Sequence, residues 1–233
     1  VVLARTIGDR AEKLLSIEDQ GDSVLLSVGA QAPLTWVGRY AAERGWAGLD
    51  WAVGLPGMVG GAAVNNAGAH GAEFKDALVS VTVLNESGEI ETHDRAWVAP
   101  RYRMTRMKEA ARPRPWHVLG VRLRLPKGCA DELSRLSDEH ADYRKRTQPT
   151  GACAGSTFAN PPGDFAGRLL EAAGMKGFAI GPVSFSTKHS NFIVNAGKGT
   201  AAQVRELIEI GRSQVREQFG VELETEIEAI GER

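Results

Sequence analysis

The segment from residue 54 to residue 71 is the part of the sequence whose composition most directly points to a binding site. It is rich in glycine and contains no Asp, Glu, Lys or Arg. Because glycine has no side chain, backbone N–H groups in such a loop can converge on an anion such as a pyrophosphate. The same glycines could instead form tight turns packed against a sheet, and spacing alone favours that simpler interpretation.

A second glycine-containing stretch, residues 197–202, follows an apolar strand pattern and opens a helix. Glu222 and Glu224 come later in the chain, at a spacing that imitates a dinucleotide-binding fingerprint. The strand that ends such a unit is covered on both faces and should be continuously apolar, whereas residues 223–230 alternate with glutamates. We therefore predict a loop and a helix N-cap here rather than a nucleotide site.

Three isolated residues have side chains suited to proton transfer or to holding negative charge. Ser156 lies in a glycine-bounded loop without the Gly-x-Ser-x-Gly setting of a hydrolase nucleophile, and a loop serine is most often a turn residue. A proton donor, however, needs only reach and an activating environment. Arg103 lies in a basic stretch typical of a solvated surface, and Glu226 shares a predicted strand face with Glu224 and Glu228. Spacing alone leaves all three roles open.

The elements expected in the first half of the chain are mostly strands. Residues 24–28 form an apolar run of strand length, and residues 33–41 have apolar positions at helical spacing. Alternation on both sides of a polar turn predicts a β-hairpin over residues 78–92. Residues 119–125 alternate as another half-buried strand. We therefore predict an antiparallel sheet.

The second half alternates helices with strands after a junction. A polar helix over residues 131–146 leads to Gln148-Pro149-Thr150-Gly151. Because Pro and Gly interrupt regular structure, we place a domain boundary between residues 145 and 146. Thr200, with Gln203 three residues later, predicts a capping box before a long amphipathic helix. The other predicted elements are a helix at 165–173, a strand at 192–194 and a closing strand at 223–229 that carries Glu226.

Composition and charge argue against several classes of protein. Hydrophobic residues make up 42% of the 233 and charged residues 24%, close to the averages for folded proteins. Lys and Arg total 28 against 29 Asp and Glu, and the net charge of −1 lacks the positive field of a nucleic-acid binder. Pro56 and the glycines interrupt the uncharged stretch at 51–72, which argues against a membrane helix. Cys129 and Cys153 form no CxxC pair, so we expect no metal site and a reducing, cytoplasmic location.

Seven motifs occur in order along nearly the whole chain. They are Gly54-Leu55-Pro56-Gly57-Met58-Val59-Gly60-Gly61, Asn66-Ala67-Gly68-Ala69-His70-Gly71, Tyr102-Arg103-Met104-Thr105, Gly155-Ser156-Thr157-Phe158-Ala159-Asn160-Pro161, Gly174-Met175-Lys176-Gly177, His189-Ser190-Asn191-Phe192 and Leu223-Glu224-Thr225-Glu226. In this order they resemble the UDP-N-acetylenolpyruvoylglucosamine reductase family. Several ordered motifs are far more specific than any one of them, so the resemblance favours a functional role for the glycine loop and for Ser156.

The resemblance implies an α+β fold with two domains. Residues 1–145 would form an FAD-binding domain of the vanillyl-alcohol-oxidase-like type, represented by its second subdomain only, and residues 146–233 a smaller α+β substrate-binding domain. The implied protein is a cytoplasmic flavoenzyme of bacterial peptidoglycan synthesis, and hence of cell-wall biogenesis, cell shape, cell cycle and division. In this family NADPH reduces FAD, and the flavin then reduces the enolpyruvyl ether of UDP-N-acetylglucosamine to the lactyl ether of UDP-N-acetylmuramate. No metal, nucleic acid, membrane or obligate protein partner is implied.

The resemblance also implies catalytic roles for three residues. Hydride delivery to the outer vinyl carbon builds negative charge on the substrate carboxylate, so the site needs hydrogen-bond donors there and an acid for the adjacent carbon. Arg103 matches the family's arginine that contacts the developing enolate. Ser156 matches the proton donor, and Glu226 matches the catalytic glutamate near the C-terminus.

Binding roles are implied for two further groups of residues. Asn160, Lys176 and His189 match positions that hold the UDP-sugar, and their simpler alternatives are a capping amide, a surface lysine and a core histidine. The positions that match the family's contacts with FAD are Gly54, Pro56, Gly57, Gly60, Gly61, Asn66 and Gly68.

The sequence departs from the family pattern in three places. Ala159 stands where Lys is common, which removes one positive group near the nucleotide sugar, and Met104 and Thr105 replace a frequent acidic residue and Ser. The chain opens with Val1 rather than Met, and the subdomain with the Gly-Ser-Asn loop on the FAD pyrophosphate would precede it. We expect full activity to need that part. Another FAD-dependent oxidoreductase of the same fold and a non-catalytic UDP-sugar-binding module remain as alternatives.

Overall fold

The computed structural model describes residues 15–110 and 114–231 and divides into two compact units. The first unit extends to Asp142 and the second begins at Tyr143. This boundary falls inside helix α6 (Ala130–Thr147), a few residues before the predicted junction. Each unit has a hydrophobic core of its own.

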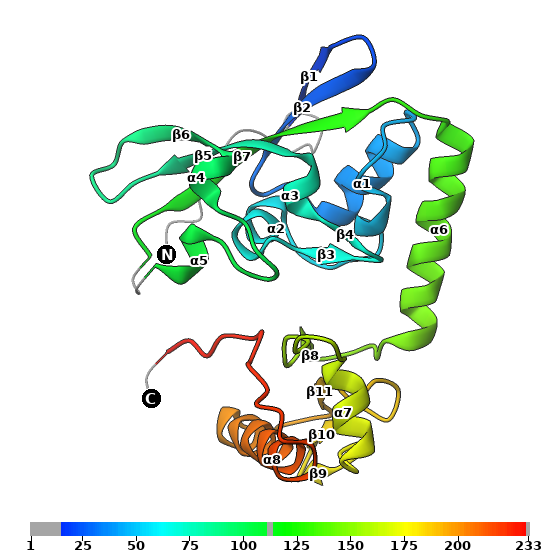
Figure 1. The fold of residues 1–233 in the computed structure, drawn as a ribbon, viewed down its shortest axis with the longest axis vertical. Helices are drawn as coiled ribbons and strands as arrows, with labels where there is room; N and C mark the ends of the chain where they lie inside the picture. Colours follow the sequence, from blue (N-terminus) through cyan, green and yellow to red (C-terminus); the bar gives the residue numbers. More distant parts are fainter. Residues whose placement is uncertain (1–14, 111–113, 232–233) are drawn as a thin grey trace. The chain divides into compact units, whose positions relative to one another are not determined.

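A five-stranded antiparallel sheet forms the centre of the first unit (Figure 1). Its strand order is β1–β2–β7–β5–β6, so the predicted strands and hairpin of the first half are confirmed. The edge strand β1 was not predicted, because its side chains are mostly exposed and give no apolar alternation. The strands are β1 (Leu15–Asp19), β2 (Ser23–Gly29), β5 (Leu78–Leu84), β6 (Ile90–Asp94) and β7 (His117–Pro126).

Short helices complete the core of the first unit. Leu34, Val37 and Ala41 are buried at helical spacing on the first of them, as the sequence predicts. The glycine-rich segment also contains a helix, α2, which packs against β7 and β2. The elements are α1 (Leu34–Ala42), the 3₁₀ turn η2 (Asp50–Ala52), α2 (Val59–Asn65), α3 (Phe74–Ala77), α4 (Arg95–Val98), α5 (Arg106–Glu109) and the small ribbon of β3 (Gly68–Ala69) and β4 (Ala72–Glu73).

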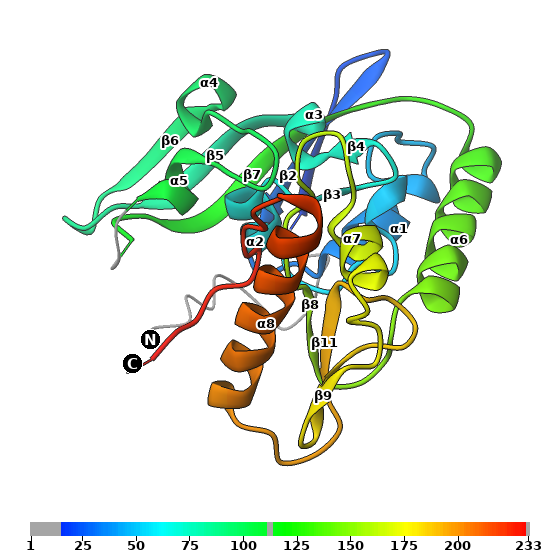
Figure 2. The same ribbon diagram turned by 60° about the horizontal axis from the view of Figure 1, so that its bottom comes forward.

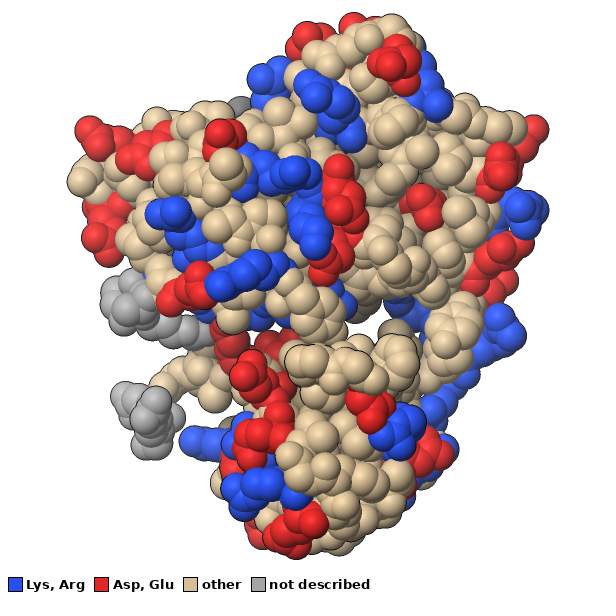
Figure 3. Space-filling model, viewed as in Figure 1, with Lys and Arg blue, Asp and Glu red and all other residues tan. Residues whose placement is uncertain are grey.

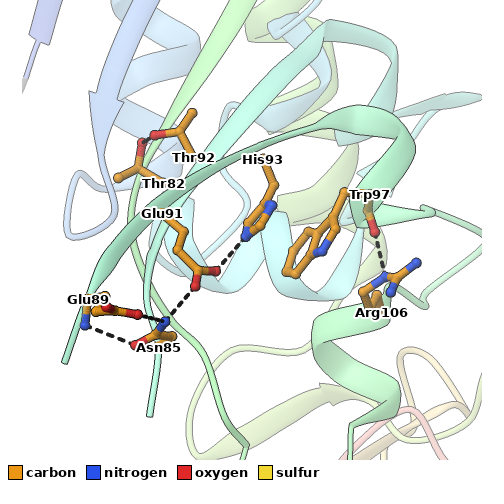
Figure 4. A network of polar contacts seen from close by, with 8 residues as sticks. All are labelled: Thr82, Asn85, Glu89, Glu91, Thr92, His93, Trp97 and Arg106. Carbon is orange, nitrogen blue, oxygen red and sulfur yellow. Dashed lines mark hydrogen bonds and ion pairs between the residues drawn. The ribbon is translucent and has the colours of Figure 1, made fainter. Parts of the chain in front are cut away.

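The β5–β6 hairpin and α4 carry a network of polar side chains that we call the hairpin network (Figure 4). Asn85 Nδ2 donates to Glu91 Oε1 at 2.5 Å, and Glu91 Oε2 lies 2.7 Å from His93 Nε2. The His93 ring stacks on Trp97 with ring centroids 3.8 Å apart, and Arg106 Nε donates to the Trp97 carbonyl at 2.8 Å. These contacts join residues that are close in sequence, so the network is local.

The second unit is built on a four-stranded antiparallel sheet with two helices (Figure 2). Leu169 and Leu170 of α7 and Leu207 and Val215 of α8 are buried in its core, as the apolar stripes predict. The strand order is β8–β11–β10–β9. The elements are β8 (Cys153–Ser156), α7 (Ala166–Ala172), β9 (Ala179–Ile180), β10 (Val183–Phe185), β11 (Phe192–Asn195) and α8 (Ala201–Phe219).

Helix α8 begins and ends with the predicted signals. Thr200 and Gln203 form a reciprocal capping box, and the helix ends at Gly220 with a φ of +69°. Upstream, the Asn195 side chain bonds the backbone of Gly199 on both its N–H and C=O sides. This loop is therefore closed on itself, in agreement with a loop and N-cap rather than a dinucleotide motif.

The closing strand predicted for residues 223–229 is wrong as a regular strand. A single bridge joins Phe158 to Thr225, flanked by bonds from Ala159 N to Glu224 O and from Glu226 N to Thr157 O, both 2.9 Å. The reason is the partner: β8 ends at Ser156, and two prolines soon follow, so the ladder has no continuation. The alternation of apolar and acidic residues correctly indicated extended backbone. It did not indicate how many residues of that backbone pair with a neighbouring strand.

Acidic and basic side chains are interspersed on the face of the first unit drawn in Figure 3. Examples from that unit are the ion pairs of Arg101 with Glu109 and of Lys127 with Asp19. This mixture matches the net charge of −1. That face therefore does not carry a large patch of one charge, such as the positive patch by which nucleic-acid binders attract phosphates.

Candidate functional site

The glycine loop between η2 and α2 presents backbone to the exterior of the first unit. Gly54, Pro56 and Gly57 are exposed, and Gly61 is exposed on the first turn of α2. A Cβ atom at Gly57 or Gly61 would meet nothing within 4 Å. Bare backbone at an open surface is what close approach by a planar or phosphate-bearing ligand requires, so these residues fit an FAD-binding role.

Two glycines of the predicted cofactor set are closely packed within the unit. A Cβ at Gly60 would lie 2.9 Å from the Cβ of Ala30. At Gly68 it would clash with the carbonyl oxygen of Ala72. Glycine at these positions allows α2 and the β3–β4 ribbon to pack closely against the rest of the unit. Gly60 and Gly68 therefore help to set the conformation of the glycine-rich segment. The glycine-rich segment therefore combines the two interpretations that spacing left open.

Asn66, another residue of the predicted cofactor set, is buried and uses its side chain internally. It ends α2 with a φ of +42°, a left-handed conformation that Asn tolerates better than most residues. Its Nδ2 donates to the carbonyl of Arg101 at 2.9 Å, and its Oδ1 accepts from the Lys75 N–H at 2.9 Å. Asn66 thus ties the end of α2 to the turn that carries Arg103.

Arg103 lies on a tight turn and reaches back over the glycine-rich segment. Arg101 and Met104 exchange backbone hydrogen bonds of 2.8 and 3.1 Å, which leaves Tyr102 and Arg103 at the tip. The φ of Arg103 is +54°, which is costly for a residue with a Cβ. Its Nη2 donates to the carbonyl of Gly68 at 2.7 Å. The guanidinium is therefore held beside the predicted cofactor loop.

Thr105, where the family often has Ser, anchors the same turn from below. It is fully buried, and its Oγ1 donates to the Val64 carbonyl in α2 at 2.6 Å. The same oxygen accepts from the Lys108 N–H and caps α5. Thr105 therefore retains the hydroxyl group that Ser would supply at this position, and that group forms two hydrogen bonds. Sequence reasoning did not identify Thr105 as a site residue, although it stands in the motif of Arg103.

Two histidines also meet beside the glycine-rich segment, and sequence reasoning missed them. His70, with a φ of +53°, stacks on His140 of α6 with ring centroids 4.0 Å apart and planes 12° apart. His140 Nδ1 lies 3.5 Å from Asp50 Oδ2. Because seventy residues separate the two rings in the chain, no local pattern could have indicated this contact.

Ser156 and Glu226 lie in the second unit, on neighbouring stretches of backbone. Ser156 ends β8, where it pairs with Phe192 of β11. The bond from Glu226 N to Thr157 O places Glu226 beside the residue that follows Ser156. Both residues are half-buried. Backbone segments that are distant in sequence are thus paired within one unit, next to Ser156 and at Glu226, while Arg103 belongs to the other unit.

His189 lies in the loop between β10 and β11, against α7. Burial lowers the pKa of its imidazole, which favours the neutral ring. Its Nδ1 accepts the N–H of Asn191 at 3.2 Å, so in the neutral ring the proton resides on Nε2. Asn191 in turn bonds both backbone groups of Phe158 at 2.8 and 2.9 Å. His189 is therefore a fixed donor connected to the Ser156 loop.

The other two predicted substrate-binding residues lie at opposite ends of α7. Asn160 Oδ1 accepts from the Ala166 N–H at 3.0 Å at the start of the helix. Lys176 Nζ forms an exposed ion pair with Glu171 Oε1 at 2.8 Å near its end. These contacts agree with the simpler roles of a capping amide and a surface lysine.

Within residues 15–110 and 114–231, no three His, Cys, Asp or Glu side chains gather in a group that could hold a metal ion. Within the same ranges, every helix is too short or too polar to cross a bilayer.

Known protein families match both units of the chain. A family model described as FAD binding domain matches residues 8–94. The model of the C-terminal domain of UDP-N-acetylenolpyruvoylglucosamine reductase matches residues 147–230. The glycine loop from Gly54 to Gly61 lies within the first matched range. Ser156 and Glu226 both lie within the second.

Individual relatives extend these matches over almost the whole chain. The reductase of that name from Chloroflexus aurantiacus is 40% identical, over 98% of this chain and 76% of its own length. The one from Bacillus velezensis is 39% identical, over 92% of this chain and 70% of its own. The crystal structure of the enzyme from Thermus caldophilus superposes with a TM-score of 0.75 at 36% identity, covering 87% of this chain and 71% of that one. The chain therefore belongs to the UDP-N-acetylenolpyruvoylglucosamine reductase family.

Proposed function

We propose that this protein reduces the enolpyruvyl ether of UDP-N-acetylglucosamine to the lactyl ether of UDP-N-acetylmuramate, with FAD as cofactor and NADPH as reductant, in the synthesis of peptidoglycan precursors. The observation that carries the proposal is the pairing of residues 157–159 with residues 224–226. It joins the backbone of the family motif that contains Ser156 to that of the motif that contains Glu226. FAD, when bound, supplies the hydride that the outer vinyl carbon receives.

The residues of the first unit would bind the cofactor and hold negative charge. The open backbone at Gly57 and Gly61 offers the surface for FAD, and Gly60 and Gly68 support it. Arg103, whose Nη2 donates to the Gly68 carbonyl, would present its guanidinium to the substrate carboxylate as that group gains charge. A preorganised cation stabilises that charge without reorganisation during the reaction.

The residues of the second unit would deliver the proton and hold the UDP-sugar. Ser156 would donate the proton to the carbon next to the carboxylate, and the carboxyl group of Glu226 would assist the reaction. His189, neutral and protonated on Nε2, is suited to donate a hydrogen bond to the nucleotide sugar. Asn160 and Lys176 flank the same helix. We assign residues 146–233 as the substrate domain on this basis.

We further propose that the protein works in the cytoplasm, without nucleic acid, membrane or obligate protein partners. Cys129 and Cys153 are both exposed and unpaired with each other, as expected in a reducing compartment. The mixed surface charge supports the absence of nucleic acid from the reaction.

The function is tested by assaying this chain beside a form extended upstream to the length of its relatives. FAD is titrated into each, and NADPH oxidation is followed with and without the enolpyruvyl substrate. We expect the extended form to bind FAD and to oxidise NADPH in a substrate-dependent way, with UDP-N-acetylmuramate as product. An extended form that binds FAD but shows no substrate-dependent turnover would contradict the proposal.

Ser156→Ala tests the acid role separately from cofactor binding. We expect NADPH to bleach the flavin colour at the normal rate, whereas recovery of the colour on adding substrate slows by about 10²-fold or more, because general acids contribute that much. Ser213→Ala is the matched control, since it removes a half-buried serine hydroxyl of the same unit, one that bonds Glu217 Oε1 at 2.6 Å. Equal slowing of both half-reactions in Ser156→Ala would refute the acid role.

A further inference from the structure

Lys108 is a half-buried cation whose ammonium group bonds the turn of Arg103. Its Nζ donates to the Arg103 carbonyl at 2.8 Å. It also donates to Asn65 Oδ1 on the last residue of α2. One side chain from α5 thus bridges the glycine-rich helix and the peptide immediately after Arg103. None of the expected functions of the chain makes use of this lysine.

The turn needs such support because of its backbone conformation. A left-handed φ at a non-glycine residue costs about 1–2 kcal/mol and persists only where neighbouring groups hold it. The backbone bonds between Arg101 and Met104 close the turn, and Asn66 ties Arg101 to the end of α2. A charge-assisted hydrogen bond from Lys108 adds a connection at the carbonyl of the strained residue itself.

Lys108 is itself held in place, so it can transmit this constraint. Its N–H donates to the buried Thr105 Oγ1, which bonds Val64 O in α2. Met107, next to it on α5, is buried in the core of the first unit. The ammonium group therefore starts from an anchored backbone, and less side-chain freedom is lost in reaching Arg103.

We propose that Lys108 is a positioning residue for Arg103: its ammonium group, with Asn65, locks the Arg103 peptide so that the guanidinium stays aimed at the substrate carboxylate. This inference rests on the proposed function, because it assigns Arg103 its role at the developing enolate. Lys108 acts through Arg103 and needs no contact with the substrate. Its loss should therefore affect the substrate-dependent step and spare the reduction of the flavin by NADPH.

The first experiment measures the turn itself, without substrate. Amide hydrogen exchange is compared in the wild type and Lys108→Met, both loaded with FAD. The Arg101 and Met104 amides should exchange about tenfold faster in the variant, the factor expected when one charge-assisted hydrogen bond is lost. Amides of β5, which do not depend on Lys108, should exchange at the wild-type rate.

The second experiment separates the two half-reactions by stopped flow. Lys108→Met should slow recovery of the flavin colour by substrate about 10- to 100-fold, while reduction by NADPH changes less than about twofold. Lys108→Arg, which keeps a charge and hydrogen-bond donors, should recover part of the rate. Lys127→Met is the matched control, because it removes an exposed lysine of the same unit whose ammonium group pairs with Asp19.

Two outcomes overturn the inference: an unchanged exchange rate of the turn, or unchanged recovery of the flavin colour in Lys108→Met. Should that variant fail to fold, Lys108→Gln and Asn65→Ala weaken the same bridge and are judged by the same measurements. Failure of the proposed function gives a different result, since the wild type itself would then show no substrate-dependent turnover.

Discussion

The turn at Arg103 and the hairpin network are both polar clusters of the first unit, yet they differ in what they connect. At the turn, Asn66, Arg103 and Thr105 bond main-chain carbonyls that are 35 to 41 residues away in sequence. In the hairpin network, Asn85, Glu91 and His93 bond side chains two to six residues away (Figure 4). Bonds to distant backbone can position a functional group, whereas bonds between side chains close in sequence only reinforce an element that already exists.

The two clusters also differ in backbone strain. Asn66 and Arg103 both have a positive φ, and both lie where the turn meets the glycine-rich segment. No residue of the hairpin network drawn in Figure 4 is among the described non-glycine residues with positive φ. Strain that is held by buried hydrogen bonds is typical of functional sites. The comparison therefore favours the turn over the hairpin network as the place for a functional group in this unit.

The largest effect is expected from Arg103→Met. Removing the guanidinium leaves the developing carboxylate charge without its donor, so substrate-dependent recovery of the flavin colour should slow by about 10²–10³-fold. Stopped-flow absorbance measures this rate. Arg122→Met, which removes an exposed arginine paired with Glu18 in the same unit, should leave it unchanged. If substrate restores the flavin colour in Arg103→Met at the wild-type rate, the turn has no role in the reaction.

Thr105→Val should have the next largest effect, on stability. The substitution keeps the shape but strands the buried Val64 carbonyl and removes the cap of α5, which together should lower the free energy of unfolding by about 1–3 kcal/mol. Thr82→Val is the counterpart in the hairpin network, where the hydroxyl bonds Thr92 at 3.1 Å and the expected change is within about 0.5 kcal/mol. Denaturant unfolding compares the two variants, and equal losses would show that burial does not separate the clusters.

The smallest effect concerns the pH dependence of the hairpin network. Hydrogen bonds from His93 and then Asn85 lower the pKa of Glu91 below its ordinary value of 4.5. A lowered pKa in the folded state means that the carboxylate stabilises the fold above that ordinary value, and that this contribution is lost as the pH falls through the lowered pKa. The difference in Tm between the wild type and Glu91→Gln should therefore be small at neutral pH and vanish in acid. A Tm difference that grows on acidification would contradict the lowered pKa of Glu91.

Local sequence patterns predicted the regular elements well, because periodicity reports which side chains face a core. Helix α8, with its capping box at Thr200, and the β5–β6 hairpin are examples. The pattern failed at residues 223–229, where alternation was present but the partner strand ended at Ser156. Pairing length depends on both partners, and only one of them is visible in a local window.

The candidate site was predictable only in part. The ordered motifs indicated Arg103, Ser156 and Glu226, but not that Gly60 and Gly68 serve packing while Gly57 and Gly61 stay open. A glycine required by a nearby Cβ and a glycine required by a ligand have the same letter in the sequence. What distinguishes them is the position of atoms from elsewhere in the fold.

By itself, then, the sequence determined the element types, the two-part organisation and the family, because helical and strand periodicities and ordered motifs are properties of neighbouring residues. The tertiary structure alone decided which polar groups are committed to the fold and which remain for chemistry. The side chains of Asn66 and Thr105 donate hydrogen bonds to distant backbone carbonyls, and the backbone after Ser156 pairs with that of Glu226. Such assignments depend on contacts between segments far apart in the chain, and hydrogen bonds form by distance in space rather than by separation in sequence.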